Sequence, residues 1–338
     1  MATPLWRPSA HLSQLMTRAA TLKQIRAFFE QRQVLEVETP LMCTSAAGDP
    51  YLNPIPVCYP FCGPKVLARD HTAHAAGSQF YLQTSAEFAM KRLLAAGSGS
   101  IYQLSKVFRG DEAGRYHNPE FTMLEWYRTE MDHRALMDEV DALLSCILET
   151  PPAERLSYAQ LFEHHLGLDP HQTSLESLKV CMVAQGLSLS PTLWASIDSD
   201  DCLDLLMTHC IEPHLGFEGP VMIDDYPASR AALACTRKRA DGVEVAERFE
   251  VYVRGMELAN GYHELRDPAI QRARFETEAA LRRRLGLPTI PMDHYLLAAL
   301  EHGLPATAGV ALGFDRLLML KLQATHIREV ISFDVERV

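Results

Sequence analysis

The sequence predicts an α+β fold in which an antiparallel sheet is flanked by helices. Apolar residues recur at helical spacing over 18–33 and 268–286, whereas 101–127 and 248–260 each carry two strand patterns joined by a polar turn. Hairpins of this kind build antiparallel sheets. The sequence also lacks the GxGxxG and GxxxxGK[ST] loops that accompany parallel nucleotide-binding sheets, which argues against a doubly wound fold.

In the first part of the chain, apolar spacing and turn residues set the boundaries. Two prolines predict an irregular leader over 1–17, and apolar spacing predicts a helix over 18–33. A strand over 34–38 ends at a Thr-Pro step, since proline restricts the residue before it. Prolines predict a long loop or irregular hairpin over 48–77. Ser85 is then predicted to cap a helix that runs through Leu94.

The centre of the chain combines a hairpin with helices. Strand patterns over 101–109 and 121–127 flank a turn-rich polar segment. A helix over 132–149 stops before two prolines, because proline lacks the N–H donor that a helix interior requires. Residues 153–215 are predicted to form a mostly helical insert.

The C-terminal part alternates strands with helices. The predicted elements are, in order, a strand at 221–223, a hairpin of strands at 248–253 and 256–260, a helix at 268–286, a small apolar strand at 309–313 and a helix at 315–322. The last two elements meet without a linker, so the residues between them lie at a strand-to-helix junction.

The hairpin at 248–260 brings two carboxylates together. A two-residue Arg-Gly turn pairs Tyr252 with Glu257 and Glu250 with Ala259. The two glutamates then lie diagonally on one face, roughly 7–8 Å apart at Cα. Converging carboxylates repel each other unless a cation lies between them, and Mg²⁺ prefers a few carboxylates together with phosphate oxygens. The alternative is a surface hairpin with ordinary solvated glutamates.

Two arginines and one strand face suggest the ligands. Arg109 ends a strand, and Arg316 stands at the strand-to-helix junction, where a planar guanidinium fork suits phosphate. Each arginine alone also fits a surface salt bridge. Alternation along 121–127 places Glu125 and Tyr127 on one face with apolar neighbours, which suits a pocket for a cationic ligand. A solvated strand face would explain Glu125 alone.

Several ordered motifs resemble those of class II lysyl-tRNA synthetases. In chain order, 18–40 is similar to the dimer-forming motif 1, 84–87 to an active-site block, 108–127 to motif 2, 257–264 to a second block and 309–316 to motif 3. The resemblance runs from about residue 15 to the C-terminus. It implies a single class II aminoacyl-tRNA synthetase catalytic domain over 18–338 that forms a homodimer through motif 1.

The resemblance is closer to one group of free-standing catalytic cores. A full lysyl-tRNA synthetase carries an anticodon-binding OB domain before motif 1, whereas only residues 1–17 precede that motif here. The chain is therefore most similar to the family of elongation factor P–(R)-β-lysine ligases. That resemblance implies ATP and Mg²⁺ as cofactors, (R)-β-lysine as substrate, and elongation factor P, with no tRNA, as the acceptor.

The resemblance also implies roles for individual residues. The expected ATP-binding residues are Arg109, Gly110, Asp111, His117, Asn118, Glu257, Leu258, Gly313 and Arg316, with Arg109 and Arg316 as the catalytic pair and Glu250 and Glu257 as metal ligands. The expected substrate-binding residues are Ser85, Ala86, Glu87, Glu125, Tyr127, Asn260, Glu264 and Ala311. Asp111 stands where relatives have glutamate, so Glu112 is an alternative contact to the adenine. Ala311 stands where lysyl-tRNA synthetases have glycine, and this added methyl implies a pocket tuned for a β-amino acid.

Composition and charge limit the remaining possibilities. There are 32 Lys+Arg against 43 Asp+Glu, and the net charge of −11 argues against broad capture of nucleic acid. No apolar run of membrane-spanning length and no signal sequence occurs, which predicts a cytoplasmic protein with reduced cysteines. Three alternatives remain: a truncated lysyl-tRNA synthetase acting on tRNA, a non-catalytic amino-acid-binding regulator, and a metal protein built on Cys58, Cys62, His71 and His74.

Overall fold

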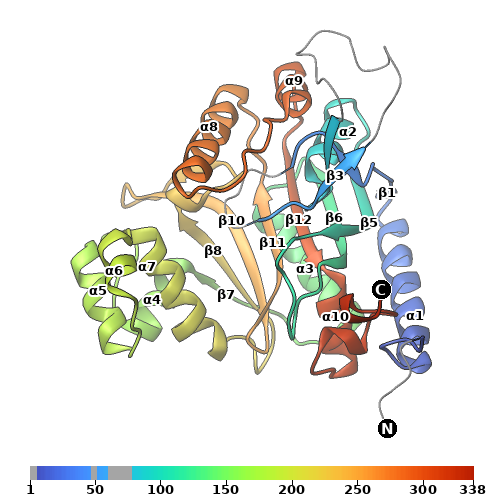
Figure 1. Cartoon of the computed structure of the whole chain (residues 1–338), viewed down its shortest axis with the longest axis horizontal. Coiled ribbons are helices and arrows are strands. Elements are labelled where there is room, and N and C mark those ends of the chain that lie inside the picture. Colours follow the sequence, from blue (N-terminus) through green and yellow to red (C-terminus); the bar gives the residue numbers. More distant parts are fainter. Residues whose placement is uncertain (1–5, 47–51, 60–77) are drawn as a thin grey trace.

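A large mixed sheet forms the centre of the computed structural model, which describes residues 6–46, 52–59 and 78–338 (Figure 1). In spatial order its strands are β1 (Leu35–Glu36), β5 (Ile101–Phe108), β6 (Glu120–Thr129), β12 (Thr307–Gly313), β11 (Met256–His263), β10 (Glu244–Val253), β8 (Val221–Pro227) and β7 (Glu154–Ser157), and β9 (Thr236–Lys238) pairs with β10. The predicted antiparallel pairing is confirmed from β5 to β8, whereas β1 and β7 add parallel pairs at the two edges.

The first helix, α1 (Leu12–Glu30), borders the sheet beside β5 (Figure 1). The side chain of Gln14 accepts a hydrogen bond of 2.9 Å from the backbone N–H of His11, which satisfies a donor at the helix start. The helix therefore begins before the predicted segment 18–33. The expectation that residues 12–17 belong to an irregular leader is wrong, because both leader prolines lie upstream of this cap.

A second, three-stranded sheet has one strand, β3 (Pro56–Tyr59), within the segment 48–77 that was expected to be a loop or irregular hairpin, and its other two strands lie on either side of that segment. Its order is β2 (Met42–Cys43), β4 (Ser78–Leu82) and β3, all antiparallel. Cys58 is exposed on β3. The other members of the considered metal cluster, Cys62, His71 and His74, lie outside the described residues.

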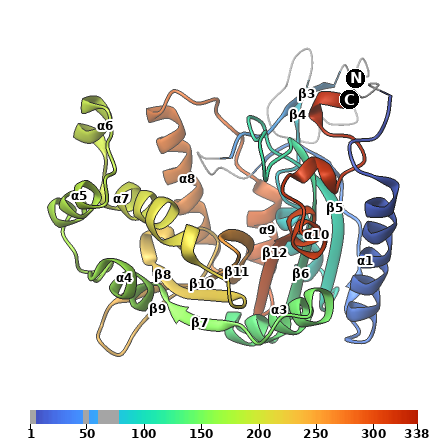
Figure 2. The same cartoon turned by 90° about the horizontal axis from the view of Figure 1, so that it is seen from below.

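Helices cover both faces of the large sheet. Helix α3 (His133–Leu148) begins at Asp132, whose side chain accepts a hydrogen bond of 2.8 Å from the backbone N–H of Ala135. Its apolar side is fully buried against Phe249 and Val251 of β10. Helix α8 (Pro268–Arg284) lies on the opposite side of the sheet (Figure 2). Helices α2 (Glu87–Ala95), α9 (His294–His302) and α10 (Phe314–Leu322), and short 3₁₀ turns at Ala228–Arg230, Ile327–Glu329 and Val335–Arg337, complete the arrangement.

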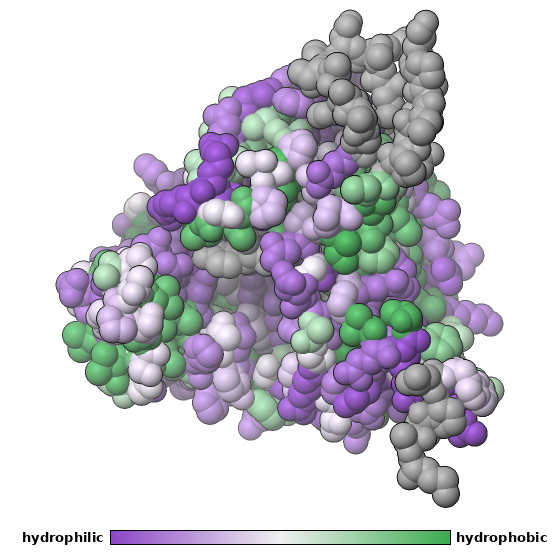
Figure 3. Space-filling view, in the orientation of Figure 1, coloured by the Kyte–Doolittle hydropathy of each residue, from purple (hydrophilic) through white to green (hydrophobic). Residues whose placement is uncertain are grey.

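The insert at 153–215 is mostly helical, as predicted, apart from β7. It contains α4 (Tyr158–Leu166), α5 (Leu175–Ala184), α6 (Pro191–Ser196), α7 (Ser199–Leu206), a π-helical turn at Met207–Ile211 and a 3₁₀ turn at Glu212–His214. Apolar side chains are exposed on this insert at Val180, Val183 and Leu193, and green atoms gather there at the left edge of Figure 3. Within the described part of the chain, none of the helices is long and apolar enough to span a membrane.

A buried ion pair joins three segments that are far apart in the sequence. Arg18 of α1 donates to Asp315 Oδ1 at 2.5 Å and to Thr122 Oγ1 at 2.7 Å. The other oxygen of Asp315 accepts from the backbone N–H of Thr122 at 2.6 Å. Asp315 is almost completely buried, so α1, β6 and α10 are held together by one satisfied carboxylate.

The β10–β11 hairpin has the predicted turn but a different register. Its turn residues, Arg254 and Gly255, have φ values of 52° and 70°, as a two-residue hairpin of this type requires. Tyr252 faces Glu257 as predicted, but a β-bulge follows, so Glu250 lies opposite Asn260. The predicted pairing of Glu250 with Ala259 is therefore wrong by one residue.

Candidate active site

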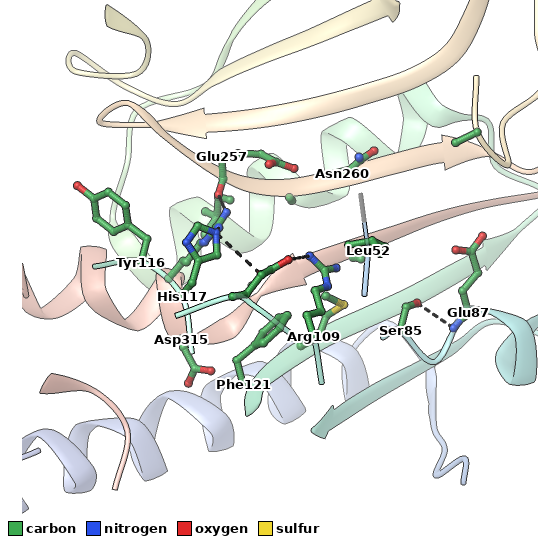
Figure 4. A pocket seen from close by; sticks show the side chains of 18 of the residues that line it. Leu52, Ser85, Glu87, Arg109, Tyr116, His117, Phe121, Glu257, Asn260 and Asp315 are labelled. Carbon is green, nitrogen blue, oxygen red and sulfur yellow. Dashed lines mark hydrogen bonds and ion pairs between the residues drawn. The ribbon is translucent and has the colours of Figure 1, made fainter. Parts of the chain in front are cut away.

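A cavity of about 450 Å³ collects most of the predicted site residues (Figure 4). The predicted residues that line it are Arg109, His117, Asn118, Glu257, Leu258, Gly313 and Arg316 from the ATP set, and Ser85, Glu87, Asn260 and Ala311 from the substrate set. In Figure 4, Glu257 and Asn260 extend from one wall, and Ser85 and Glu87 lie at the end away from Tyr116 and His117. The cavity thus has two chemically different ends.

The two predicted arginine side chains line the cavity: Arg316 lies beside His117 at one end, and Arg109 lies between the two ends (Figure 4). One nitrogen of Arg316 donates to the backbone oxygen of Glu257 at 2.7 Å, and the other lies 2.7 Å from His117 Nε2. Burial, the guanidinium of Arg316 and that of Arg109 lower the pKa of His117, so a neutral ring can accept this hydrogen bond. Arg109 lies 3.8 Å from Glu112 across the same wall. Both guanidinium groups therefore line the cavity, where they can donate to an anionic ligand.

Three predicted ATP-binding residues take different positions around the cavity. Asp111 is exposed, does not line the cavity and accepts a hydrogen bond of 3.1 Å from Asn53. Glu112, the alternative residue expected at this position, lines the cavity instead. Gly110 donates to the backbone oxygen of Asn53 at 2.7 Å and does not line the cavity. Asn118 is buried, and its amide donates to the backbone oxygen of Glu120 at 2.7 Å, which shapes the loop.

The two predicted metal ligands, Glu250 and Glu257, differ in whether their carboxylate oxygens are already bound by other side chains. Glu250 accepts hydrogen bonds from Tyr226 at 2.7 Å and from Tyr252 at 2.6 Å, and it also forms an ion pair with Arg248. Glu257 lines the cavity instead. Burial and the negative charge of Glu250 raise the pKa of Glu257 to about 7, although Arg316 and Arg248 partly oppose this shift. A divalent cation at Glu257 would relieve this repulsion, so the pair fits a metal that Glu257 contacts directly.

Glu125 does not line the cavity itself, but it holds the loop at the end where Ser85 and Glu87 lie. Its carboxylate accepts one hydrogen bond from the Ser85 hydroxyl at 2.9 Å and another from the backbone N–H of Ala86 at 2.8 Å. Ser85 in turn accepts from the backbone N–H of Glu87 at 3.0 Å, although Ala86 is the residue that immediately precedes helix α2. Burial raises the pKa of Glu125 to about 7, against the effect of these two donors. Glu125 therefore fixes the loop that presents Glu87 to the cavity.

A buried ion network lies next to this loop. Lys91 Nζ is 2.6 Å from Glu87 Oε1 and 2.5 Å from Glu264 Oε2. Burial raises the pKa of Glu264 to about 7, while Lys91 lowers it. A Cβ atom at Gly309 would overlap the ring of Tyr127 and the carboxylate of Glu264, so only glycine leaves room for both side chains. Tyr127 and Glu264 are thus placed in a layer behind the cavity wall.

The central strand positions Ala311 between two predicted substrate contacts. Ala311 of β12 faces Asn260 of β11 on one side and Glu125 of β6 on the other. Arg248 donates to the side-chain oxygen of Asn260 at 3.3 Å, which orients that amide. The Ala311 methyl therefore lies on the cavity wall between the strands that carry these polar groups.

Three residues that support the glutamates in and behind the cavity wall were not predicted from the sequence: Lys91, Arg248 and Tyr226. Lys91 follows Glu87 by four residues on a helix, and Arg248 precedes Glu250 by two residues on a strand, so helical and strand spacing could have identified both. Tyr226 reaches Glu250 from the neighbouring strand β8, and no local pattern indicates this contact.

Comparisons with known proteins agree with this architecture. Residues 5–337 match the family described as tRNA synthetases class II (D, K and N), and the chain belongs to this family. Among the curated relatives, the elongation factor P–(R)-β-lysine ligases of Edwardsiella ictaluri and Vibrio cholerae are 51% and 50% identical over 332 residues, which cover 98% of each chain. The ligase so named from Pseudoalteromonas translucida is 48% identical over 339 residues and the full length of both chains.

Proposed function

We propose that this protein activates (R)-β-lysine with ATP and transfers it to a lysine side chain of elongation factor P. The names of relatives at about half identity over nearly full length support this activity. The observation that carries the proposal is the distribution of charge along the cavity: Arg316 lies beside His117 at one end, Glu87 lies at the other end, and Arg109 lies between them (Figure 4). The phosphates of ATP require cationic side chains, whereas the ammonium groups of a diamino acid require anionic ones. This cavity has side chains of both kinds.

In the first step, the carboxylate oxygen of (R)-β-lysine attacks the α-phosphorus of ATP, and pyrophosphate leaves. Arg109 donates to the α-phosphate, and Arg316 donates to the γ-phosphate. Because both guanidinium groups are already held in place, they stabilise the developing charge with little reorganisation. The products are an enzyme-bound β-lysyl adenylate and free pyrophosphate.

Glu257, with Glu250 behind it, would hold Mg²⁺ during this step. Bound there, the metal would supply charge neutralisation for the phosphate oxygens. Glu250 itself is fixed by Tyr226, Tyr252 and Arg248, so its contribution in this arrangement is its negative charge.

In the second step, the neutral ε-amine of the acceptor lysine attacks the carbonyl carbon of the adenylate. The amide bond forms as the bond to AMP breaks, and the amine loses its proton to solvent. Meanwhile Glu87 and Asn260 hold the β-lysyl group at the inner end of the cavity. The net charge of −11 suits a protein acceptor better than a polyanionic RNA.

An exchange assay and a transfer assay test this proposal. We expect (R)-β-lysine to support exchange of labelled pyrophosphate into ATP, and we expect label from (R)-β-lysine to appear on elongation factor P. Variants of this elongation factor without its acceptor lysine serve as the control. Label on tRNA alone would contradict the proposal, and so would strict preference for α-lysine.

We also propose a homodimer formed through the first helix and the strand that follows it. Large apolar side chains are exposed in this region, including Leu12 and Met16 of α1 and Leu35 of β1. Burying such residues between two copies would remove apolar surface from water. Sedimentation of the protein and of a Met16→Glu variant tests this, and a wild-type monomer at micromolar concentration would contradict it.

A further inference from the structure

A lysine with no assigned role occupies the charged layer behind the amino-acid end of the cavity. Lys91 of α2 is 1% exposed, and its ammonium lies 2.6 Å from Glu87 and 2.5 Å from Glu264. Glu264 is equally buried, whereas Glu87 reaches the cavity wall. Lys91 therefore connects a carboxylate that faces the cavity to one that lies behind it.

This bridge is needed because the two carboxylates are close to each other in a region with little water. Two buried carboxylates that share a site repel, and one of them takes up a proton unless a cation lies between them. Burial raises the pKa of Glu264 to about 7, and the negative charge of Glu87 acts in the same direction. The positive charge of Lys91 acts in the opposite direction and lowers this pKa. The ammonium thus favours the ionised form of Glu264 and holds the two carboxylates in a fixed relative position.

The charges at this end of the cavity can be counted. Glu87, Glu125 and Glu264 contribute three negative charges when ionised, and Lys91 contributes one positive charge. The tyrosines beside them, Tyr127 and Tyr262, are neutral, since burial raises the pKa of both phenols. Lys91 thus offsets one of three acidic groups, and the remaining excess of acidic groups favours a ligand that carries ammonium groups.

We propose that Lys91 is a positioning residue that sets the charge and geometry of the amino-acid end, so that the cavity selects substrates with two ammonium groups. This inference rests on the proposed function and assigns the specificity of that same site to a residue that does not touch the substrate. Lys91 acts through Glu87 and Glu264, and its removal should change amino-acid binding without changing ATP binding.

Truncation followed by chemical rescue tests the proposal. In Lys91→Ala, the KM for (R)-β-lysine in pyrophosphate exchange should rise about tenfold or more, because one partner of a buried charge network is lost. The KM for ATP should stay within about twofold, since Lys91 contacts neither Arg109 nor Arg316. Added n-propylammonium, which replaces the removed atoms, should restore the KM for (R)-β-lysine, whereas 1-propanol should not.

Three further variants separate this role from a purely structural one. Lys91→Met fills the same space without the charge, and it should raise the same KM if Lys91→Ala does not fold. Lys106→Met is the matched control, since Lys106 forms an exposed pair with Glu120 on the surface of the sheet. Lys91→Arg, which keeps the positive charge, should retain a KM closer to that of the wild type than Lys91→Met does.

The outcomes distinguish the proposed role of Lys91 from the proposed function of the protein. Unchanged KM values in folded Lys91→Ala and Lys91→Met, with an active wild type, would overturn the role of Lys91 alone. Equal rescue by 1-propanol would also overturn it, because the charge would then be irrelevant. A wild type that activates neither (R)-β-lysine nor α-lysine would overturn the proposed function as well.

Discussion

Replacement of Glu257 by glutamine should change how many protons the protein releases when it binds magnesium–ATP. Burial and the nearby Glu250 raise the pKa of Glu257 from 4.5 to about 7. The difference of about 2.5 corresponds to roughly 3.4 kcal/mol against the ionised form at 1.36 kcal/mol for each pH unit. A cation that binds the ionised carboxylate must therefore displace a proton whenever Glu257 carries one.

The expected proton release follows from that pKa. At pH 7 about half of the Glu257 carboxyls carry a proton, so binding should release about 0.5 proton from this group, rising to about 0.9 at pH 6. Titration calorimetry in two buffers with different ionisation enthalpies measures this number. The Glu257→Gln variant keeps the size of the side chain and should lose this release.

A control and a contrary outcome complete the test. Glu120→Gln removes an exposed carboxylate of β6 outside the cavity, and it should leave proton release unchanged. If wild type and Glu257→Gln release the same number of protons at pH 6 and at pH 7, then Glu257 is not the group that meets the metal. The assignment of Mg²⁺ to this carboxylate would then be incorrect.

The remaining predictions concern a glycine, an arginine and a buried ion pair. Gly309→Ala should raise the KM for (R)-β-lysine about tenfold or more in pyrophosphate exchange, because the new methyl displaces Tyr127. Arg316→Lys should lower the kcat of the same exchange about 10²-fold or more, since an ammonium cannot reproduce the planar fork. Arg18→Met should lower the free energy of unfolding in urea by about 3 kcal/mol, because Asp315 would remain buried without its cation.

Matched variants control these three measurements. Gly114→Ala adds a methyl where no atom lies within 4 Å, so it should leave KM unchanged. Arg26→Met breaks an exposed pair with Glu36 and should change the unfolding free energy by less than about 1 kcal/mol. Arg134, whose exposed side chain pairs with Asp224 and Asp225 of β8 and does not line the cavity, supplies Arg134→Lys as the control for kcat. An effect of each test variant no larger than that of its control would contradict the corresponding argument.

The strands and the hairpin turn could be predicted because their signals are local. The Arg254-Gly255 turn and the strand patterns over 248–253 and 256–260 depend on neighbouring residues only, and the structure confirms a hairpin there. The bulge next to Tyr252 could not be predicted, since its position depends on how β10 and β11 pair with strands on both sides. A single extra residue was enough to move Glu250 from Ala259 to Asn260.

The site was predicted in outline, whereas its supporting contacts were not. Motif order indicated Arg109 and Arg316, and both line one cavity. The hydrogen bond from Tyr226 to Glu250 depends on the packing of α4 and β8, which tertiary structure alone determines. The start of α1 was misplaced because a glutamine cap one turn into the helix is a weak signal compared with two prolines.

The position of β12 has a consequence for how the protein is made. This strand comes from residues 307–313, yet it lies between β6 and β11 in the middle of the large sheet. While the ribosome is still synthesising the preceding residues, β6 and β11 each present an unpaired edge, and exposed edges of this kind can pair with other chains. The nascent chain therefore cannot complete the cavity, which Gly313 and Arg316 help to line, until nearly all of it has emerged, and premature termination before β12 should yield aggregation-prone fragments.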